Sequence, residues 1–450
     1  MPGDSLLPVA TERETQSIPG VGAPSRWQTL RHYVSAAVLP MVVTRFMLVL
    51  VGIITVDYIL PLINPNQPIY PDPSIKHLHI MLYLMWQHFD SGFYISIASG
   101  GYWAAPTLKG MSNWAFFPLY PLLMFIFAFV IGTSHAGAYS IAGLLVSFMA
   151  TLVAGIYLFR ITKLEYSEQV ANRAVWLLAV FPMSFYLTAI YPESLALTLS
   201  ITCLYYARRR AWWRAGICGG LAAITHPQGV LLIAPVGYEL WQTLAEQVAP
   251  LEQAKNWQAS IKKWCHSRFV AVWRAFRRWQ TWAALAALCL IPLGLGLFCL
   301  YGYIKVHTFT PFALTEQNGW GRHFINPLQL IQQMIQHPRP ASPYDWNFYG
   351  LNLVMLFFGL FMLIPIFKRL PFAYGLYTLL NVLLPVTAGE TNSVARFTLG
   401  LFPIYMALAL WCSRGTWVRQ ERRYSLLLVV FSLLLSLFMA MFTLGIYSLS

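Results

Sequence analysis

Four polar residues in this apolar chain lie in settings where they could do chemistry. Asp90 lies in HFDSGFYISIASGGYW, between aromatic side chains and a glycine-rich run, and a carboxylate so surrounded is poorly hydrated and a better base. Arg322 follows two glycines in EQNGWGR, and Arg396 lies in SVARF. An arginine can bind a phosphate through two parallel hydrogen bonds. With Glu193 in IYPES, the set offers a candidate base, a second carboxylate and two candidate phosphate ligands.

Each of these residues also has a structural interpretation, which the sequence leaves open. Asp90 could be a solvated loop carboxylate or a helix cap. For Glu193 the favoured interpretation is that it stabilises a helix start. Arg396 could pair with Glu390 across a turn. His226, which precedes a proline, is of a kind that is more often a hydrogen-bonded structural residue than a catalyst.

The elements that must position these residues are membrane-spanning helices. Of the 450 residues, 58% are hydrophobic and 10% are charged, against roughly 25% charged in soluble domains. The predicted fold class is therefore all-α, a polytopic membrane protein. Apolar segments of roughly spanning length occur near 36–62, 115–133, 139–159, 174–190, 194–207, 215–228, 229–246, 281–303, 350–367, 371–388, 397–413 and 425–448.

Basic loops set the predicted orientation, because loops rich in lysine and arginine stay in the cytoplasm. The net charge of +14 is explained by these loops and by anionic lipid, so no nucleic-acid partner is expected. Residues 1–34 are predicted to be a disordered cytoplasmic tail, 35–450 a single membrane domain, and 250–280 a cytoplasmic amphipathic segment. The four basic loops are 207–214, 255–280, 367–370 and 413–423. The chain makes an even number of crossings between each successive pair, so all four are predicted to lie on the cytoplasmic side.

One apolar segment must then fail to cross the membrane. The N-terminus and residues 160–173 should both be cytoplasmic, so a segment between 113 and 160 has to turn back. The candidate is 115–127, because its two prolines would interrupt a helix. The resulting prediction is about eleven transmembrane helices, with the C-terminus outside.

Several distant segments share the predicted extracytoplasmic side, among them a first loop at 63–113 and a later loop at 304–349. The first loop should hold an amphipathic helix from about residue 82 to 97, with Trp86, Asp90 and Tyr94 on one face. Carboxylates and arginines at span ends are costly unless they pair or line a wet cavity, so they are functional candidates. With Asp90 as the base, the expected substrate-binding residues are Glu193, His226, Gln317, Trp320, Arg322, Glu390 and Arg396.

Five sequence blocks, in order, resemble a known family. They are HFDSGFYISIASGGY, NWAFFPLYPLL, FPMSFYLTAIYPESLAL, EQNGWGR and SVARFTLGLFP. They are similar to motifs of the second GPI mannosyltransferase (PIG-V) family and its prokaryotic relatives, from about residue 36 to 413. Phe89 stands where the family usually has tryptophan, and THPQG at 225–229 stands where an Arg- and Asn-containing segment is common. The identity of donor or acceptor is therefore less specified than the class.

The resemblance implies a C-type glycosyltransferase in the bacterial plasma membrane with an extracytoplasmic site. Such an enzyme would transfer a sugar, typically mannose, from a polyprenyl-phosphate donor to a lipid-linked or glycan acceptor. The family's presumed base maps to Asp90, and Arg322 and Arg396 would hold the departing phosphate. Glu193 would orient a sugar hydroxyl, hold an arginine, or bind a divalent cation with Asp90. Trp114 and Trp320 could stack on a sugar ring, although anchoring at the membrane interface is the favoured interpretation.

The alternative function class is a transporter or lipid flippase, in which charged residues also lie in wet cavities. A transporter should show an internal repeat with matched broken helices, and its polar residues should lie near mid-span. No convincing repeat is visible, and the polar candidates gather at the outer span ends. These features favour the enzyme. Acceptor, sugar, metal dependence and partner subunits stay open.

Overall fold

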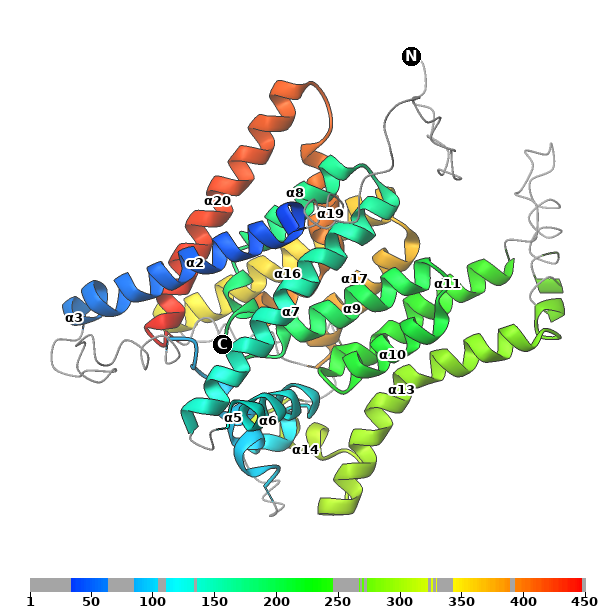
Figure 1. The fold of residues 1–450 in the computed structure, drawn as a ribbon, viewed down its shortest axis with the longest axis horizontal. Helices are drawn as coiled ribbons and strands as arrows, with labels where there is room; N and C mark the ends of the chain where they lie inside the picture. The colour runs from blue at the N-terminus through cyan, green and yellow to red at the C-terminus, as the bar shows by residue number, and fades with distance from the viewer. Residues whose placement is uncertain are drawn as a thin grey trace.

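In the computed structural model every regular element of the described residues is helical (Figure 1), which confirms the all-α fold class. The structure describes residues 34–63, 85–103, 111–132, 136–245, 273–322, 343–388 and 393–446, together with 267, 269, 270, 325, 326 and 329. The predicted N-terminal tail and most of the predicted amphipathic segment at 250–280 lie outside these residues.

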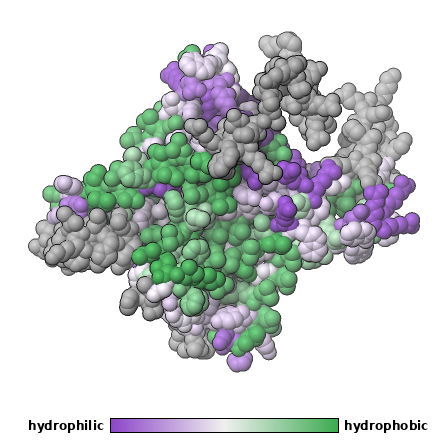
Figure 2. Space-filling view, in the orientation of Figure 1, coloured by the Kyte–Doolittle hydropathy of each residue, from purple (hydrophilic) through white to green (hydrophobic). Residues whose placement is uncertain are grey.

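Five helices of the described chain are long and apolar enough to cross a membrane. The first is a continuous helical run over 34–63 that contains α2 (Leu39–Ile54) and α3 (Leu60–Ile63). Figure 2 shows a broad apolar surface across the middle of the molecule, as lipid contact requires. The other four are α7 (Ala136–Glu165), α13 (Trp279–Val306), α16 (Pro343–Arg369) and α20 (Trp417–Thr443).

Shorter helices pack between and beside these five. A helix of 17 residues or fewer is too short to cross the roughly 30 Å hydrocarbon layer without tilting or burial among its neighbours. The shorter helices are α5 (Ser91–Gly100), α6 (Leu119–Ile131), α8 (Glu168–Ala179), α9 (Glu193–Arg208), α10 (Trp212–Ala223), α11 (Ile233–Ala245), α14 (Pro311–Trp320), α17 (Phe372–Thr387), α18 (Val394–Thr398) and α19 (Phe402–Cys412). The count of about eleven crossings stays a prediction.

The predicted span 174–190 is not one helix. Helix α8 ends at Ala179, and a buried irregular segment with one 3-10 turn, Ser184–Leu187, leads to α9. Pro182 explains the break, because proline lacks the N–H that would continue the helix and restricts the residue before it.

A buried arginine satisfies the free carbonyl groups of this irregular segment. The guanidinium of Arg45, on α2, donates to the carbonyl oxygens of Ser184 (2.7 Å) and Ala179 (2.8 Å). The hydroxyl of Thr151, on α7, donates to the Leu187 carbonyl (2.6 Å). Irregular backbone within a membrane protein is tolerated only where neighbours supply such hydrogen bonds. Arg45 therefore has a structural role.

Helix α6 follows the two prolines that were expected to interrupt it. It is unbroken over 13 residues, with Pro118 at the N-cap and Pro121 in the first turn. The expected interruption is therefore wrong, since proline in the first turn of a helix breaks no hydrogen bond. The helix, about 20 Å long, packs along the first half of α7, where the Tyr120 hydroxyl donates to the Gly143 carbonyl (3.0 Å). That this segment does not cross the membrane stays a prediction.

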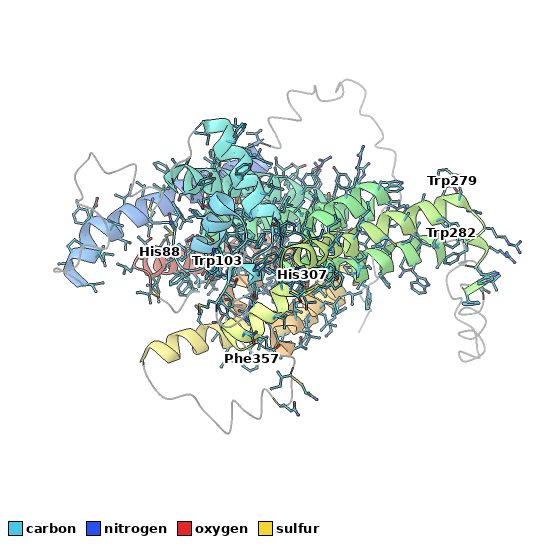
Figure 3. All side chains as sticks on the ribbon, turned by 90° about the horizontal axis from the view of Figure 1, so that it is seen from below. His88, Trp103, Trp279, Trp282, His307 and Phe357 are labelled. Atoms are coloured by element: carbon cyan, nitrogen blue, oxygen red, sulfur yellow. The ribbon has the colours of Figure 1, made fainter. Side chains whose placement is uncertain are left out.

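The basic loops gather at one end of the bundle, here called the basic end. Figure 2 shows hydrophilic surface where α20 begins and near the start of α13. At the start of α13 two exposed tryptophans, Trp279 and Trp282, lie far from His307 at its other end (Figure 3), as expected of interfacial anchors. Contacts that join the loops include the ion pair of Arg208 with Glu165, the bond from the Tyr166 hydroxyl to the Arg369 carbonyl, and the bond from Arg173 to the Cys412 carbonyl.

Glycines let α10 and α13 approach each other closely. A Cβ at Gly216 would lie 2.0 Å from the Ala287 carbonyl oxygen, and one at Gly220 would lie 2.6 Å from that of Leu290. Small residues at such crossings are typical of packed membrane helices.

We expect Gly216→Ala to separate these two helices and to destabilise the protein by about 1–3 kcal/mol, the usual cost of overpacking. Gly296→Ala is the matched control, because a Cβ at Gly296 has no atom within 4 Å. Thermal unfolding of both variants in one detergent checks the prediction. Equal midpoints for the two variants would contradict it.

Candidate functional site

Asp90 lies at the N-cap of α5, at the end of the bundle opposite the basic end. Residues 85–90 form turns, and Phe89 adopts φ 53°, a left-handed backbone that is unfavourable for an aromatic residue. The described part of the predicted helix at 82–97 is therefore helical only from Ser91. Trp86 lies outside it, so Trp86, Asp90 and Tyr94 do not share one helix face. The Asp90 side chain makes no capping bond to α5, which removes the cap interpretation.

The Asp90 carboxylate instead pairs with Arg396, 306 positions later in the chain. Arg396 Nη1 donates to Asp90 Oδ2 at 2.7 Å. The Asp90 backbone N–H donates to the Tyr191 hydroxyl (3.1 Å), and that hydroxyl donates to the His88 carbonyl (2.8 Å). The turn that carries Asp90 is thus fixed to the irregular segment before α9.

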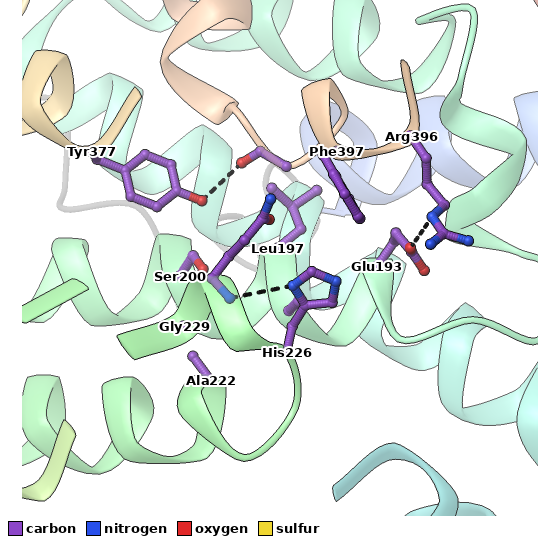
Figure 4. Close-up of a pocket in the computed structure, with 12 residues that line it drawn as sticks. Glu193, Leu197, Ser200, Ala222, His226, Gly229, Tyr377, Arg396 and Phe397 are labelled. Carbon is purple, nitrogen blue, oxygen red and sulfur yellow. Dashed lines mark hydrogen bonds and ion pairs between the residues drawn. The ribbon is translucent and has the colours of Figure 1, made fainter. Parts of the chain in front are cut away.

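Arg396 lies between two carboxylates. On its other side Nε lies 3.0 Å from Oε1 of Glu193, the first residue of α9 (Figure 4). The guanidinium carbon also lies 5.2 Å from the ring centre of Tyr191 and 5.3 Å from that of Phe397. Two ion pairs and two aromatic rings therefore hold the guanidinium in place. Of the three roles considered for Glu193, the structure shows the one in which it holds an arginine.

Short helix α18 places Arg396 at this point. Ser393, just before the helix, has φ 66°, and the backbone N–H of Ala395 donates to Oδ1 of the buried Asn352 (2.8 Å). Non-glycine residues in the left-handed region thus precede both Asp90 and Arg396 closely. Such strain persists only where the surrounding structure enforces it, and it concentrates at functional sites.

A second arginine–carboxylate pair joins Glu316 on α14 to Arg322, just beyond the C-terminal end of that helix. Arg322 Nη1 donates to Glu316 Oε2 at 2.8 Å, and both side chains are partly exposed. Burial raises the pKa of the Glu316 carboxyl above its ordinary value, although the neighbouring Arg322 lowers it in part. Trp320 packs its edge against Phe93 and Phe116, with ring centres 5.9 and 5.8 Å away.

His226 lies between the two arginines. Its Nδ1 accepts a weak hydrogen bond from the backbone N–H of Gln228 (3.4 Å), so its other nitrogen carries the proton of the neutral ring. Burial, together with Arg396 and Arg322, lowers the pKa of His226 to about 3. His226 is therefore a neutral hydrogen-bond donor and cannot act as a cation at neutral pH.

Asp90, Arg396 and Arg322 line one cavity of about 60 Å³, here called the polar pocket. It adjoins an apolar cavity of about 360 Å³, and His226, Glu316, Arg322 and Phe397 line both. The apolar walls come from α14, the end of α17 and the segment before α6, and they include Phe117, Phe312, Ala313, Leu384, Pro385 and Ala388. An ionic site that opens sideways onto a larger apolar cavity fits an amphipathic ligand with a charged head and a hydrocarbon tail.

A third cavity, of about 30 Å³, lies behind Arg396 and is shown in Figure 4. Glu193, Ser200, Gln228 and Tyr377 line it, and Asp90 does not. Glu193 Oε2 and Gln228 Nε2 are buried and have no hydrogen-bond partner among the described residues. This rear pocket has room for about one or two water molecules, which is too little for a sugar.

The family comparison decides what kind of protein carries this site. The family model described as mannosyltransferase (PIG-V) matches residues 32–310, more than half of the chain. The chain belongs to the mannosyltransferase (PIG-V) family. This confirms the family that the five sequence blocks resemble. Comparison with curated proteins finds no match.

Solved structures with a similar arrangement come from the archaeon Archaeoglobus fulgidus. Its oligosaccharyltransferase in the apo form is 10% identical, with a TM-score of 0.45 over 94% of this chain and 57% of that one. The same protein, AglB, in complex with an inhibitory peptide and a dolichol-phosphate is 11% identical, with a TM-score of 0.44 over 94% of this chain and 56% of that one. This PIG-V family chain thus spans a little over half the length of those proteins.

The remaining predicted site residues fall in different places. Gln317 points to the exposed side of α14, away from the polar pocket, so the structure gives it no part in the site. Glu390 lies outside the described residues. Trp114 is 1% exposed and stacks on Tyr102, so its expected anchoring at the membrane interface is wrong. Trp320 lines the polar pocket, and both of its expected roles stay predictions.

No cluster of three or more His, Cys, Asp or Glu side chains in the described chain is arranged to hold a metal ion. The cation that lies between Asp90 and Glu193 is the guanidinium of Arg396. Sequence reasoning gave no role to Tyr191 or Phe397, which pack on that guanidinium, or to the apolar walls of the larger cavity. Tyr191 could have been suspected, because it lies two residues before Glu193 in IYPES.

Proposed function

We propose that this PIG-V family chain is a membrane glycosyltransferase, with residues 35–450 as its single catalytic domain. It transfers a sugar, with mannose as the first candidate, from a polyprenyl-phosphate donor to a hydroxyl of a lipid-linked or glycan acceptor. The observation that carries the proposal is the junction of the two cavities. The arginines of the polar pocket suit a phosphate, and the adjoining apolar cavity suits the first part of a polyprenyl chain.

The reaction needs a base on one side of the sugar and a stabilised leaving group on the other. Asp90 would take the proton of the acceptor hydroxyl while that oxygen forms a bond to the anomeric carbon. The bond from that carbon to the phosphate oxygen breaks, and its electron pair leaves with the polyprenyl phosphate. Arg396 and Arg322 would stabilise this charge, so no general acid is required. His226 would donate a neutral hydrogen bond to the phosphate or the sugar.

We place the site on the extracytoplasmic face of a bacterial plasma membrane. The support is that the basic loops share one end of the bundle and the polar pocket lies at the other. Loops rich in lysine and arginine remain in the cytoplasm. The donor would then reach the site sideways from the outer leaflet.

Incubation of the purified protein with labelled polyprenyl-phosphate mannose and lipid acceptors tests the proposal. We expect a mannosylated product and released polyprenyl phosphate, with less product from the glucose analogue. An arm with a chelator shows whether a divalent cation is required. Movement of the labelled donor across vesicle membranes without any product would contradict the proposal and favour the flippase.

Glu316 predicts a pH dependence of phosphate binding. Because its pKa is raised, its carboxyl takes up a proton at a higher pH than an ordinary glutamate does. As the pH falls through that pKa, Glu316 loses its charge and releases Arg322 to a phosphate ligand. We therefore expect the affinity for farnesyl phosphate to rise toward acid pH more in the wild type than in Glu316→Gln, as measured by titration calorimetry. Parallel pH profiles would contradict this role, since the ionisation of the ligand itself affects both proteins equally.

A further inference from the structure

Arg396 has two carboxylate partners, and the two differ in where they lie. The Glu193 side chain is 8% exposed and faces the rear pocket, whereas that of Asp90 is 22% exposed and faces the polar pocket. A phosphate that enters the polar pocket therefore meets Arg396 on the side that Asp90 occupies. Glu193 lies behind the guanidinium, where the phosphate does not reach.

The rest of the surroundings hold Arg396 still. Glu193 is the first residue of α9, and its side chain is buried. The rings of Tyr191, Phe397 and Tyr186 lie within 5.8 Å of the guanidinium carbon. The backbone of the Asp90 turn is also held, but its side chain is the more exposed of the two carboxylates and makes no bond to α5. The partner that can exchange is thus Asp90.

The bond between Asp90 and Arg396 occupies two groups that the proposed reaction uses. Arg396 pairs with both carboxylates, and its bond to Asp90 is charge-assisted. The Asp90 oxygen that accepts this bond is not free to take a proton from an acceptor hydroxyl. A phosphate oxygen on Arg396 would displace the Asp90 oxygen and leave that carboxylate free beside the bound donor.

We infer that Arg396 exchanges Asp90 for the donor phosphate, and that Glu193 is the positioning residue that holds Arg396 during the exchange. Both oxygens of the base then become free when a donor is bound, which favours ordered binding with the donor first. This inference rests on the proposed function, since it is the phosphate of the proposed donor that displaces Asp90 from Arg396.

The exchange makes a testable prediction about binding, because Asp90 competes with the phosphate in the resting protein. Asp90→Asn keeps the shape of the side chain but replaces a charge-assisted bond with a weaker neutral one. We expect it to bind farnesyl phosphate about tenfold more tightly than the wild type does. Asp90→Ala, which removes the acceptor altogether, should tighten binding at least as much. Titration calorimetry in detergent measures both, and farnesol serves as the tail-only ligand, whose affinity should not change.

Glu193→Gln is the matched variant, since it likewise replaces a carboxyl partner of Arg396 with an amide. Because it loosens the positioning of the guanidinium, we expect weaker phosphate binding and a raised donor KM with an unchanged acceptor KM. Glu193→Asp should recover part of the donor KM.

Equal tightening in Asp90→Asn and Glu193→Gln would mean that net charge alone governs affinity, and would overturn the exchange. Unchanged or weaker binding in both Asp90 variants would also overturn it, and would leave the proposed function standing if the wild type transfers sugar. Absence of transfer from every lipid-phosphate donor would instead remove the proposed function.

Discussion

Asp90→Asn is expected to lower the rate of sugar transfer by roughly a hundredfold or more, the usual contribution of a general base. The amide cannot take a proton from the acceptor hydroxyl, although it can still accept a hydrogen bond from Arg396. The fold should therefore persist, and the loss should appear in kcat, while the donor KM should fall with the tighter phosphate binding expected of this variant. Initial rates of product formation at saturating donor measure the effect.

The control for this variant is the same substitution at an exposed aspartate. Asp57 lies on the first helical run, outside the described cavities, so Asp57→Asn should keep the wild-type rate. Transfer by Asp90→Asn within threefold of that control would remove Asp90 from the mechanism.

Arg396→Ala is expected to weaken donor binding far more than acceptor binding, because the phosphate loses its central ligand. The variant also leaves Asp90 and Glu193 unpaired, and removal of one partner from a buried pair costs about 3–5 kcal/mol. Arg396→Lys separates the two effects. Lysine keeps the positive charge but lacks the planar set of N–H donors of a guanidinium. The variant should therefore fold and still show a donor KM raised by roughly tenfold or more.

Arg419→Ala is the control for the arginine variants, because Arg419 is exposed at the basic end. Separate donor and acceptor titrations of transfer, together with thermal unfolding, measure the outcome. A folded Arg396→Lys with unchanged donor KM, or with equal changes in both KM values, would contradict the phosphate role.

The sequence predicts the fold class, and it predicts that the site residues share one end of the bundle. It predicts the bounds of the shorter helices and the contacts within the site less well. Hydropathy locates α7, α13, α16 and α20, because a long apolar helix in lipid needs no tertiary context to be identified. The basic loops locate one end of the bundle, and the separation of acidic from basic loops places Asp90, Glu193, Arg322 and Arg396 at the other.

What the sequence does not reveal depends on contacts between residues far apart in the chain. The pairing of Asp90 with Arg396 spans 306 positions, and no periodicity encodes it. The left-handed backbone at Phe89 interrupts an apparent helical pattern, because tertiary contacts override local spacing there. Arg45 resembles a misplaced charge until the carbonyl groups of the irregular segment after α8 are seen around it.

An experimental structure of the protein with a non-transferable polyprenyl-phosphate mannose analogue tests the central claim most directly. The account predicts the phosphate within hydrogen-bonding distance of Arg396, the polyprenyl chain along Phe312 and Leu384, and Asp90 freed from Arg396 and facing the anomeric carbon. A phosphate bound at the basic end, or a sugar placed beyond the reach of the Asp90 carboxylate, would contradict it.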